Sequence, residues 1–467
     1  MSRPVRKVSV AVVSWNGRRH LETLLPALAA QDDPGVPWEV LVLDNGSRDG
    51  TAAWVRERFP RVRLVESPVN LGFCAGNERL VEAAEGDAVA FLNNDTRPRE
   101  GWLAALVAAL AAAPGDVAAV SGTIVDWEGE RLDFARGVMT FDGHAFQLGF
   151  RRPLAGPGAA DVPPDGAELP FACGGNMLVR RDSFRAAGGF DADYFAYLED
   201  VDLGWRLWAG GERVVFAREA VVHHRSSATS DLLGLYNRGF LFERNAFLTV
   251  AKNYEDGLWE RMMPAVLVTL TQRTLHLLVH ANPGGASLAL DPYAGAIADT
   301  GGGAAGAGAG AARADASAGT APPSDVEPPA RLRDLPERWR RYGTVELARR
   351  LADRLRREIA ARRRPAGEPG SGRGAPTLTD ERTVAQLRAV SYLLGHLDAV
   401  AGKRRAVQAR RRVPDREILA RFPPWLVATY PGDAELFASP GFRAWLPAEP
   451  RLVEARLDEV MELGGGG

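Results

Sequence analysis

The chain has 467 residues, of which 46% are hydrophobic and 25% charged, and its formal net charge is -2. This length predicts two or three globular domains, and the balanced charge points to no class of partner. Two cysteines are too few for a disulfide framework or a structural zinc site, and polar residues interrupt the longest apolar stretch, 262–279, so we expect a cytoplasmic protein without a spanning helix or signal peptide.

Apolar, β-branched runs alternate with helical patterns through the first 112 residues. Continuous apolar runs predict buried strands, and apolar residues spaced three and four apart predict helices. We expect strands at residues 8–13, 40–43, 62–66 and 88–92, and helices at 18–30, 51–59, from 77 to 84, and 102–112. This alternation predicts a parallel sheet with helices on both faces, in which ligands bind at the carboxyl ends of the strands.

The following residues are less regular. We expect strands at 117–125, 177–180 and 213–216 and helices at 181–187 and 198–209. The irregular, Gly-, Pro- and aromatic-rich stretch at 126–169 predicts strands and a mobile loop over the acceptor side. Residues 232–280 are mostly helical, and two arginine-rich stretches, 331–364 and 379–412, have helical patterns. The predicted division is a catalytic domain at 1–230 with halves 1–115 and 116–230, a helical extension at 231–282, a Gly/Ala/Pro-rich disordered linker at 283–330, and a basic helical region at 331–467.

Polar residues follow three of the predicted strands, at 14–16, 44–47 and 93–95. The carboxyl ends of parallel strands share one edge of a sheet, so this coincidence predicts a nucleotide site there. A carboxylate such as Asp44 can accept the imide N–H of uracil or thymine, although it could instead be a turn residue that caps the next helix. Gly72 and Gly76 permit a close backbone approach before a helix, but their spacing does not match a dinucleotide or P-loop fingerprint, which disfavours a dehydrogenase.

The order of these motifs resembles the family 2 glycosyltransferases. The resemblance rests on VVSWN at 12–16, VLDNGSRDGT at 42–51, NLGFCAGN at 70–77 and FLNND at 91–95, then FD at 190–191, LEDVDLGWR at 198–206 and HH at 223–224. It covers roughly residues 5–250 and is strongest for bacterial rhamnosyltransferases and related enzymes of cell-surface polysaccharide synthesis. It implies the GT-A fold, a Rossmann-like, mixed and mostly parallel α/β sheet with helices on both faces, followed here by a mainly α-helical C-terminal extension.

The resemblance assigns roles in donor binding. The implied nucleotide-binding residues are Ser14, Asn16, Asp44, Ser47, Asn70, Gly72, Asn77 and Asn94. Asp95 stands where the family has an Asp-x-Asp motif that holds Mg²⁺ or Mn²⁺ on the diphosphate, with Asn93 in place of the first aspartate. His224 is the further metal ligand that the family implies, with His223 as its competitor. A turn aspartate and a structural histidine are the alternatives.

The resemblance also assigns the acceptor side. Asp200 matches the family's general base, and Glu199 would position the acceptor or orient Asp200. Asp202 is two residues further on and would point elsewhere on a helix, so we expect it to be structural. The alternative is that all three acids only complement the dipole of a helix. Gly174, Gly175 and Asn176 would form the floor of the acceptor site, because glycines let the backbone approach a sugar closely.

These features predict an inverting, metal-dependent glycosyltransferase. We expect it to move a sugar, rhamnose from dTDP-rhamnose before a UDP-hexose or UDP-galactofuranose, to a hydroxyl of a polyprenyl-diphosphate-linked glycan. The basic C-terminal patches predict peripheral contact with an anionic membrane at its cytosolic face, and a solvated helix face is the alternative. A catalytically inactive scaffold of a polysaccharide assembly complex is the alternative function, supported by Asn93. A nucleotidyltransferase fits poorly because no Gly/Arg/Lys-rich phosphate loop follows the first strand.

Overall fold

The structure is a computed structural model that describes residues 3–225, 234–289 and 377–461. One compact unit comprises Met1–Gly285 and Thr377–Gly464. A second unit comprises Ala286–Pro376 and Gly465–Gly467, of which only residues 286–289 are described. The predicted linker beyond residue 289 and the predicted helix at 331–364 therefore lie outside the described residues.

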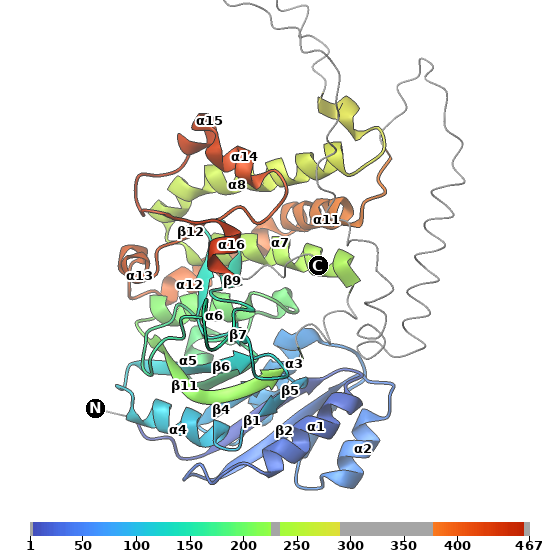
Figure 1. The fold of residues 1–467 in the computed structure, drawn as a ribbon, viewed down its shortest axis with the longest axis vertical. Coiled ribbons are helices and arrows are strands. Elements are labelled where there is room, and N and C mark those ends of the chain that lie inside the picture. The colour runs from blue at the N-terminus through green and yellow to red at the C-terminus, as the bar shows by residue number, and fades with distance from the viewer. Residues whose placement is uncertain (1–2, 226–233, 290–376, 462–467) are drawn as a thin grey trace, which may run out of the picture. The chain divides into compact units, whose positions relative to one another are not determined.

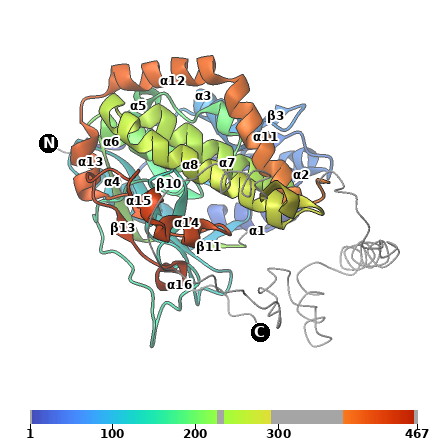
Figure 2. The same cartoon turned by 90° about the horizontal axis from the view of Figure 1, so that it is seen from above.

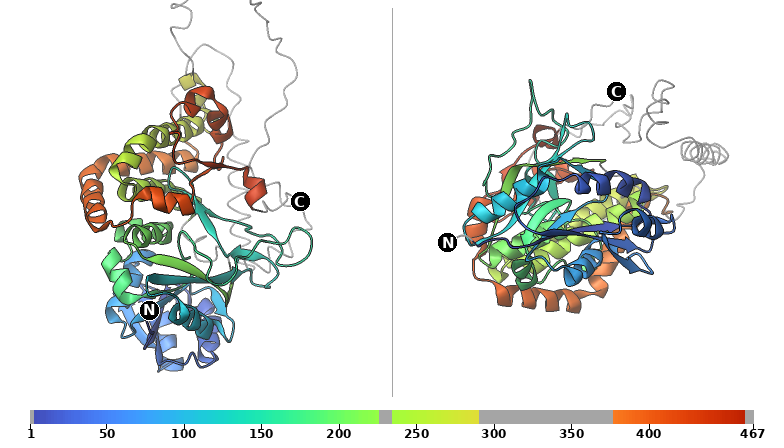
Figure 3. Two further views of the ribbon diagram at one scale, coloured as in Figure 1. Left: turned by 90° about the vertical axis from the view of Figure 1, so that its left-hand side faces the viewer. Right: turned by 90° about the horizontal axis from the view of Figure 1, so that it is seen from below.

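A nine-stranded mixed sheet forms the centre of the first unit, and helices cover both of its faces (Figures 1 and 3). Its main path runs β3-β2-β1-β4-β10-β6-β11-β5, with β7 paired to β6. The strands are β1 Val8–Ser14, β2 Trp38–Asn45, β3 Arg63–Ser67, β4 Ala88–Leu92, β5 Thr96–Pro98, β6 Val117–Val125, β7 Leu132–Phe134, β10 Asn176–Arg180 and β11 Arg213–His224. Strands β1 to β4 pair in parallel, whereas β10 is antiparallel to both β4 and β6.

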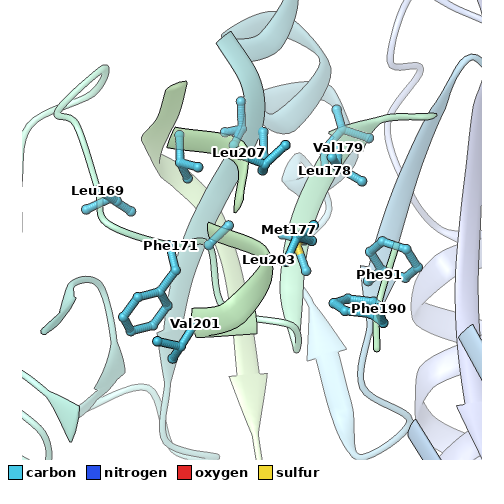
Figure 4. Close-up of a cluster of buried hydrophobic side chains, with 14 of the residues drawn as sticks. Phe91, Leu169, Phe171, Met177, Leu178, Val179, Phe190, Val201, Leu203 and Leu207 are labelled. Carbon is cyan, nitrogen blue, oxygen red and sulfur yellow. The ribbon is translucent and has the colours of Figure 1, made fainter. Parts of the chain in front are cut away.

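Helices of the catalytic region follow these strands closely. They are α1 Arg18–Ala29, α2 Thr51–Arg58, α3 Gly72–Ala83, α4 Trp102–Ala112, α5 Arg181–Ala187, the short η1 Ala192–Tyr194 and α6 Glu199–Ala209. Their apolar faces bury leucine, valine and phenylalanine against the sheet, and Figure 4 shows part of this core, with Phe91 and Phe190 beside one another. The predicted GT-A architecture with its helical extension is therefore confirmed.

Two regions add detail to the sequence prediction. The stretch at 126–169, where strands and a loop are expected, contains β7 and a hairpin of β8 Gly137–Met139 and β9 Ala145–Gln147. The strand expected at 213–216 continues to His224, because a bulge between Ala217 and Val221 carries it past the polar pair Arg218 and Glu219. The bulge interrupts the alternating pattern from which strands are read.

The helical extension combines two segments that are distant in sequence. It consists of α7 Gly234–Asn253, α8 Asp256–His280, η3 Gly285–Ala289, α11 Glu381–Gly395, α12 Leu397–Arg410, α13 Asp415–Arg421, α14 Asp433–Ala438, α15 Pro440–Arg443 and α16 Leu457–Val460, with a small sheet of β12 Trp425–Leu426 and β13 Val453–Glu454. Helices α11 and α12 form a bent pair along α7 (Figure 2).

Charged residues of α12 hold it on the catalytic region. Lys403 pairs with Asp191 and Asp193, and Arg404 donates to the Ala251 carbonyl at 2.7 Å. Arg410 and Arg411 also bond to protein groups. Four of the six basic residues at 403–412 are thus engaged inside the protein, so the predicted membrane contact rests mainly on the undescribed residues 331–364.

One helix of the described residues, α8, is long and apolar enough to cross a membrane by length and composition. It is packed in the compact unit, however, and its buried Arg273 pairs with Asp142 and Asp433. These ion pairs favour the prediction that α8 does not span a membrane.

Candidate active site

A cavity of about 510 Å³ opens at the carboxyl ends of β1, β2 and β4. It brings together two runs that are separated by about a hundred residues in the sequence, Asn93–Asp95 and Glu199–Asp200. Its other walls come from the β9 hairpin, the glycines before β10, and α7. The sequence prediction that these two runs form one site therefore has a structural basis in this shared cavity.

The donor side of the cavity is held by a network around Asn45, which the sequence analysis did not single out. The Asn45 amide donates to Asn70 Oδ1 at 2.9 Å and to the Gly72 carbonyl at 3.1 Å. Its own oxygen accepts from the Leu71 N–H at 2.9 Å. Asn45 follows Asp44 at the end of β2, so the polar turn signal was correct, but the residue that faces the cavity is Asn45.

Gly72 is required by the backbone at the start of α3. It has a φ of +78°, and a Cβ there would lie 2.6 Å from the Phe195 carbonyl. That carbonyl accepts from the Phe73 N–H at 2.7 Å, and Phe195 itself has a φ of 62°. This contact joins the donor side of the cavity to the loop before Asp200, and the close approach requires glycine at position 72.

The other predicted nucleotide residues lie in two turns. Ser14 Oγ accepts from Asn94 Nδ2 at 3.1 Å, and Asn94 lines the cavity. Asn16 and Ser47 link their two turns, because the Asn16 N–H donates to Ser47 Oγ at 2.8 Å. Asp44 accepts from the Ser47 N–H at 3.0 Å, which is a turn contact. Asp44, Asn16 and Ser47 are not among the cavity-lining residues.

Asn77 lies within α3 and away from the cavity lining. Its amide donates to the Phe73 carbonyl at 3.0 Å, one turn earlier in the helix. The side chain is almost fully buried, and its oxygen has no hydrogen-bond partner in the described part of the chain. These contacts indicate a structural role for Asn77.

Asp95 and His224 meet at the base of the cavity. His224 Nε2 lies 3.3 Å from Asp95 Oδ1, and His224 Nδ1 lies 2.8 Å from Asp133 Oδ2. Burial opposes ionisation of His224 and Asp95, yet the two neighbouring carboxylates raise the pKa of His224 well above its usual value, and His224 lowers the pKa of Asp95. Asp133 lies on β7, in the stretch that was read as irregular, and its role was not predicted.

His223 points away from this group. Its ring nitrogens lie 3.4 Å from Arg99 Nε and 3.2 Å from the Trp127 carbonyl, and it is not part of the cavity lining. Successive residues of a strand face opposite sides, so only one member of the histidine pair can reach the cavity. The structure places His224 there.

Asp200 and Glu199 begin α6, and both line the cavity. Asp200 accepts from the Gly174 N–H at 3.0 Å and from the Val201 N–H at 2.8 Å. Burial raises the pKa of both carboxyls, and the charge of Asp200 adds to the rise at Glu199. Asp200 is partly exposed to the cavity, whereas Glu199 is buried and its Oε2 has no hydrogen-bond partner among the described residues.

The two glycines before β10 separate the two acidic groups. A Cβ on Gly174 would lie 3.2 Å from Glu199 Oε1, and one on Gly175 would lie 2.9 Å from Asn93 Nδ2. Both residues line the cavity. Asn176 does not line it, because its amide bonds the Thr123 and Ala220 carbonyls and accepts from Trp102 Nε1 inside the core.

Asp202 has the structural position that the sequence analysis expected. It is fully buried and pairs with Arg206 at 2.7 Å and with Lys252 at 3.0 Å. It therefore faces α7 and the interior of the protein, two residues beyond Asp200.

Comparison with known proteins agrees with this arrangement. Residues 9–188 match the family model described as Glycosyl transferase family 2. The N-acetylglucosaminyl-diphospho-decaprenol L-rhamnosyltransferase of Mycobacterium tuberculosis is 33% identical over 238 residues, which cover 47% of this chain and 76% of that protein. The O-antigen biosynthesis protein RfbC of Myxococcus xanthus is 32% identical over 237 residues, covering 48% of this chain and 18% of that protein.

Solved structures resemble the fold more distantly. GalNAc-T7 with UDP, GalNAc and Mn²⁺ aligns with a TM-score of 0.44 at 15% identity, covering 56% of this chain and 51% of that chain. The mannosyltransferase PcManGT from Pyrobaculum calidifontis, with GDP-Man and Mn²⁺, aligns with a TM-score of 0.38 at 19% identity, covering 64% and 80%.

Proposed function

Because the chain belongs to glycosyl transferase family 2, we propose that it is an inverting glycosyltransferase acting on a lipid-linked glycan. The donor is a nucleoside diphosphate sugar, and dTDP-rhamnose is favoured by the similarity to a rhamnosyltransferase whose named acceptor is a diphospho-decaprenol. The observation that carries the proposal is that Asp95 with His224 and Asp200 line one cavity.

Asp200 is the general base of this mechanism. Its carboxylate takes the proton of the acceptor hydroxyl while that oxygen forms a bond to the anomeric carbon and the bond to the diphosphate breaks. The raised pKa of Asp200 makes its ionised form a better proton acceptor than a free carboxylate. Gly174 fixes the carboxylate through its N–H.

Asp95 and His224 fit a divalent metal ion, either Mg²⁺ or Mn²⁺. A carboxylate oxygen and an imidazole nitrogen 3.3 Å apart are a donor pair suited to one cation. Asp133 bonds the other ring nitrogen and would orient the imidazole. The His224 ring lies between the Asp95 and Asp133 carboxylates, so the three side chains do not converge on one point. No converging cluster of metal ligands is found among the described residues. The metal would neutralise the diphosphate leaving group.

The donor side would be formed by Asn45, Asn70 and the backbone at Gly72. Their network already orients amide and carbonyl groups at the rim of the cavity. The Asp44 carboxylate accepts from the Ser47 N–H and would have to give up this hydrogen bond to accept from the nucleotide base. We therefore keep Asp44 as a weaker candidate than the cavity residues.

Thermal unfolding with dTDP, UDP and GDP, each with and without Mn²⁺, tests the donor site. A ligand that binds the folded state raises the melting temperature by mass action. We expect a Mn²⁺-dependent rise with dTDP or UDP that is lost in Asp95→Asn and kept in the exposed control Asp161→Asn. No rise with any nucleotide would contradict the proposal.

Donor hydrolysis without acceptor separates this enzyme from an inactive scaffold. We expect wild-type protein to release nucleoside diphosphate slowly from dTDP-rhamnose, and Asp200→Asn to release less. Nucleotide binding without any release or transfer would favour the scaffold.

A further inference from the structure

A second cavity, of about 350 Å³, lies beside the catalytic one, between α6 and the C-terminal tail. The outward face of α6 forms one wall through Val201, Trp205 and Trp208, which are spaced four and three residues apart. The opposite wall comes from Ile418, Phe422 and Trp425 in and after α13. No role has been assigned to these aromatic residues so far.

The partition between the two cavities is only one side chain thick. Phe171 and Val201 line both of them, and Figure 4 shows these two side chains at one edge of the buried cluster. Val201 directly follows Asp200. Phe146 of the catalytic cavity packs edge-on against Trp425 of the second cavity, with ring centroids 5.9 Å apart.

Three charged residues, Arg136, Glu168 and Arg421, line the second cavity. Glu168 is paired with Arg421 at 2.7 Å and with Arg213 at 3.2 Å. Arg136 stands at the start of β8 and has only a 3.4 Å contact to the exposed Asp161. Its Nε is buried and has no hydrogen-bond partner among the described residues. The Arg136 guanidinium could therefore donate a hydrogen bond from Nε to an anion beside this cavity.

We propose that the second cavity binds the first isoprene units of the lipid-linked acceptor. The acceptor consists of a sugar, a diphosphate and a hydrocarbon chain, in that order. The protein offers Asp200 in the catalytic cavity for the sugar hydroxyl, and Arg136 for the diphosphate and apolar walls for the chain in the second cavity. A sugar would need several polar partners around its ring, whereas indole, phenyl and aliphatic walls suit a branched hydrocarbon. This inference rests on the proposed function, because it names the acceptor class of the same enzyme.

The test uses acceptors that differ only in the chain, namely N-acetylglucosaminyl diphosphates with a methyl, a C10 or a C20 isoprenoid group, below their micelle concentrations. Burial of the chain should make KM for the C10 acceptor at least about tenfold lower than for the methyl acceptor. Leu148→Trp fills the cavity and should reduce that ratio to about one. The matched control Leu394→Trp, on the exposed face of α11, should keep the ratio.

A binding experiment separates failure of this inference from failure of the proposed function. Geranylgeranyl diphosphate with a photoreactive diazirine on its chain should cross-link to peptides containing Met139 or Trp425, and Val453→Trp should reduce the yield if Leu148→Trp does not fold. Cross-linking there without any glycosyl transfer would overturn the proposed function but support this site. Transfer with a KM that is independent of the chain, or cross-links elsewhere, would overturn the lipid site.

Discussion

The catalytic cavity and the helical extension both contain buried carboxylates, but the pKa values of the two groups move in opposite directions. In the cavity, burial raises the pKa of Glu199 and Asp200, and no cation of the described residues pairs with them. Where the extension meets the β8–β9 turn, burial also opposes ionisation of Glu243 on α7 and of Asp142 in the turn, yet Arg273 and His144 lower the pKa of both, that of Glu243 to about 2.

The partners explain the difference. Arg273 forms two bonds of 2.9 Å with Asp433 and one of 2.8 Å with Asp142. His144 Nε2 lies 3.0 Å from Glu243 Oε1, and Gln386 donates to the other oxygen of Glu243 at 2.8 Å. We call these six residues the clamp network. It joins the β8–β9 turn to α7, α8, α11 and α14, and therefore to both segments of the extension.

This comparison shows how burial can serve two purposes. Carboxylates that are buried with cations hold elements together, whereas carboxylates that are buried without cations remain available for a proton. Substitutions in the two groups should therefore separate activity from stability.

The largest expected effect is on activity. Asp200→Asn removes the general base and should lower kcat about 10³-fold, with donor affinity and melting temperature nearly unchanged, as measured by product formation and thermal unfolding. Glu199→Gln is the comparison, because it keeps the shape of a carboxyl whose neutral form burial favours, and it should lower kcat much less. A kcat within tenfold of wild type for Asp200→Asn would contradict the assignment of the base.

The clamp network should show the reverse behaviour. Arg273→Leu leaves Asp142 and Asp433 buried without their cation and should lower the free energy of unfolding by at least about 3 kcal/mol, as measured by urea denaturation. Arg261→Leu on the exposed face of the same helix should have little effect. Equal stability of the two variants would mean that the network does not hold the extension.

The same network predicts a pH dependence of stability. Burial lowers the pKa of His144, but Asp142 and Glu243 raise it to about 9, against 6.5 when unfolded. The protonated form therefore stabilises the fold, fully below pH 6.5, and this contribution is lost as the pH rises towards 9. Asp415, whose pKa burial raises to about 6, acts in a separate window between pH 3.8 and 6.

Urea denaturation at pH 6, 7.5 and 9 measures this contribution. The free energy of unfolding of wild type should fall by about 2 kcal/mol over this range, and that of His144→Gln should fall less. The groups that face His144 are Asp142, Glu243, Arg273 and Tyr430. None of these four groups is expected to titrate between pH 6 and 9. Parallel curves for the two proteins would assign the dependence to another residue.

The sequence predicted the fold well where periodicity was strong. The apolar runs of β1, β2, β3 and β4 and the helices α1 and α2 lie within about two residues of their predicted positions, whereas α3 begins at Gly72, five residues before the predicted start at 77. The same reasoning found both acidic runs of the cavity and preferred His224 to His223. These features are local: each depends on neighbours in the chain or on the shared edge of a parallel sheet.

Contacts between distant segments could not be read from the sequence. Asn45 was hidden because its neighbour Asp44 is the more obvious polar residue of the same turn, and only the packing of α3 shows which one faces the cavity. The clamp network depends on residues up to 291 positions apart, Asp142 and Asp433, that no pattern connects. Asp133 was missed because the three residues of β7 are too few for a recognisable pattern.

Asp133 also provides the smallest of the expected effects and the sharpest test of the metal site. Asp133→Asn keeps an oxygen for the His224 Nδ1–H but removes the charge, so it should weaken Mn²⁺ binding about tenfold without unfolding the protein. Titration of Mn²⁺ in the presence of dTDP, followed by electron paramagnetic resonance, measures this affinity directly. The exposed control Asp161→Asn should bind Mn²⁺ as wild type does. If the two variants bound Mn²⁺ equally well, His224 would not depend on Asp133, and the metal would be held by the Asp95 side of the cavity.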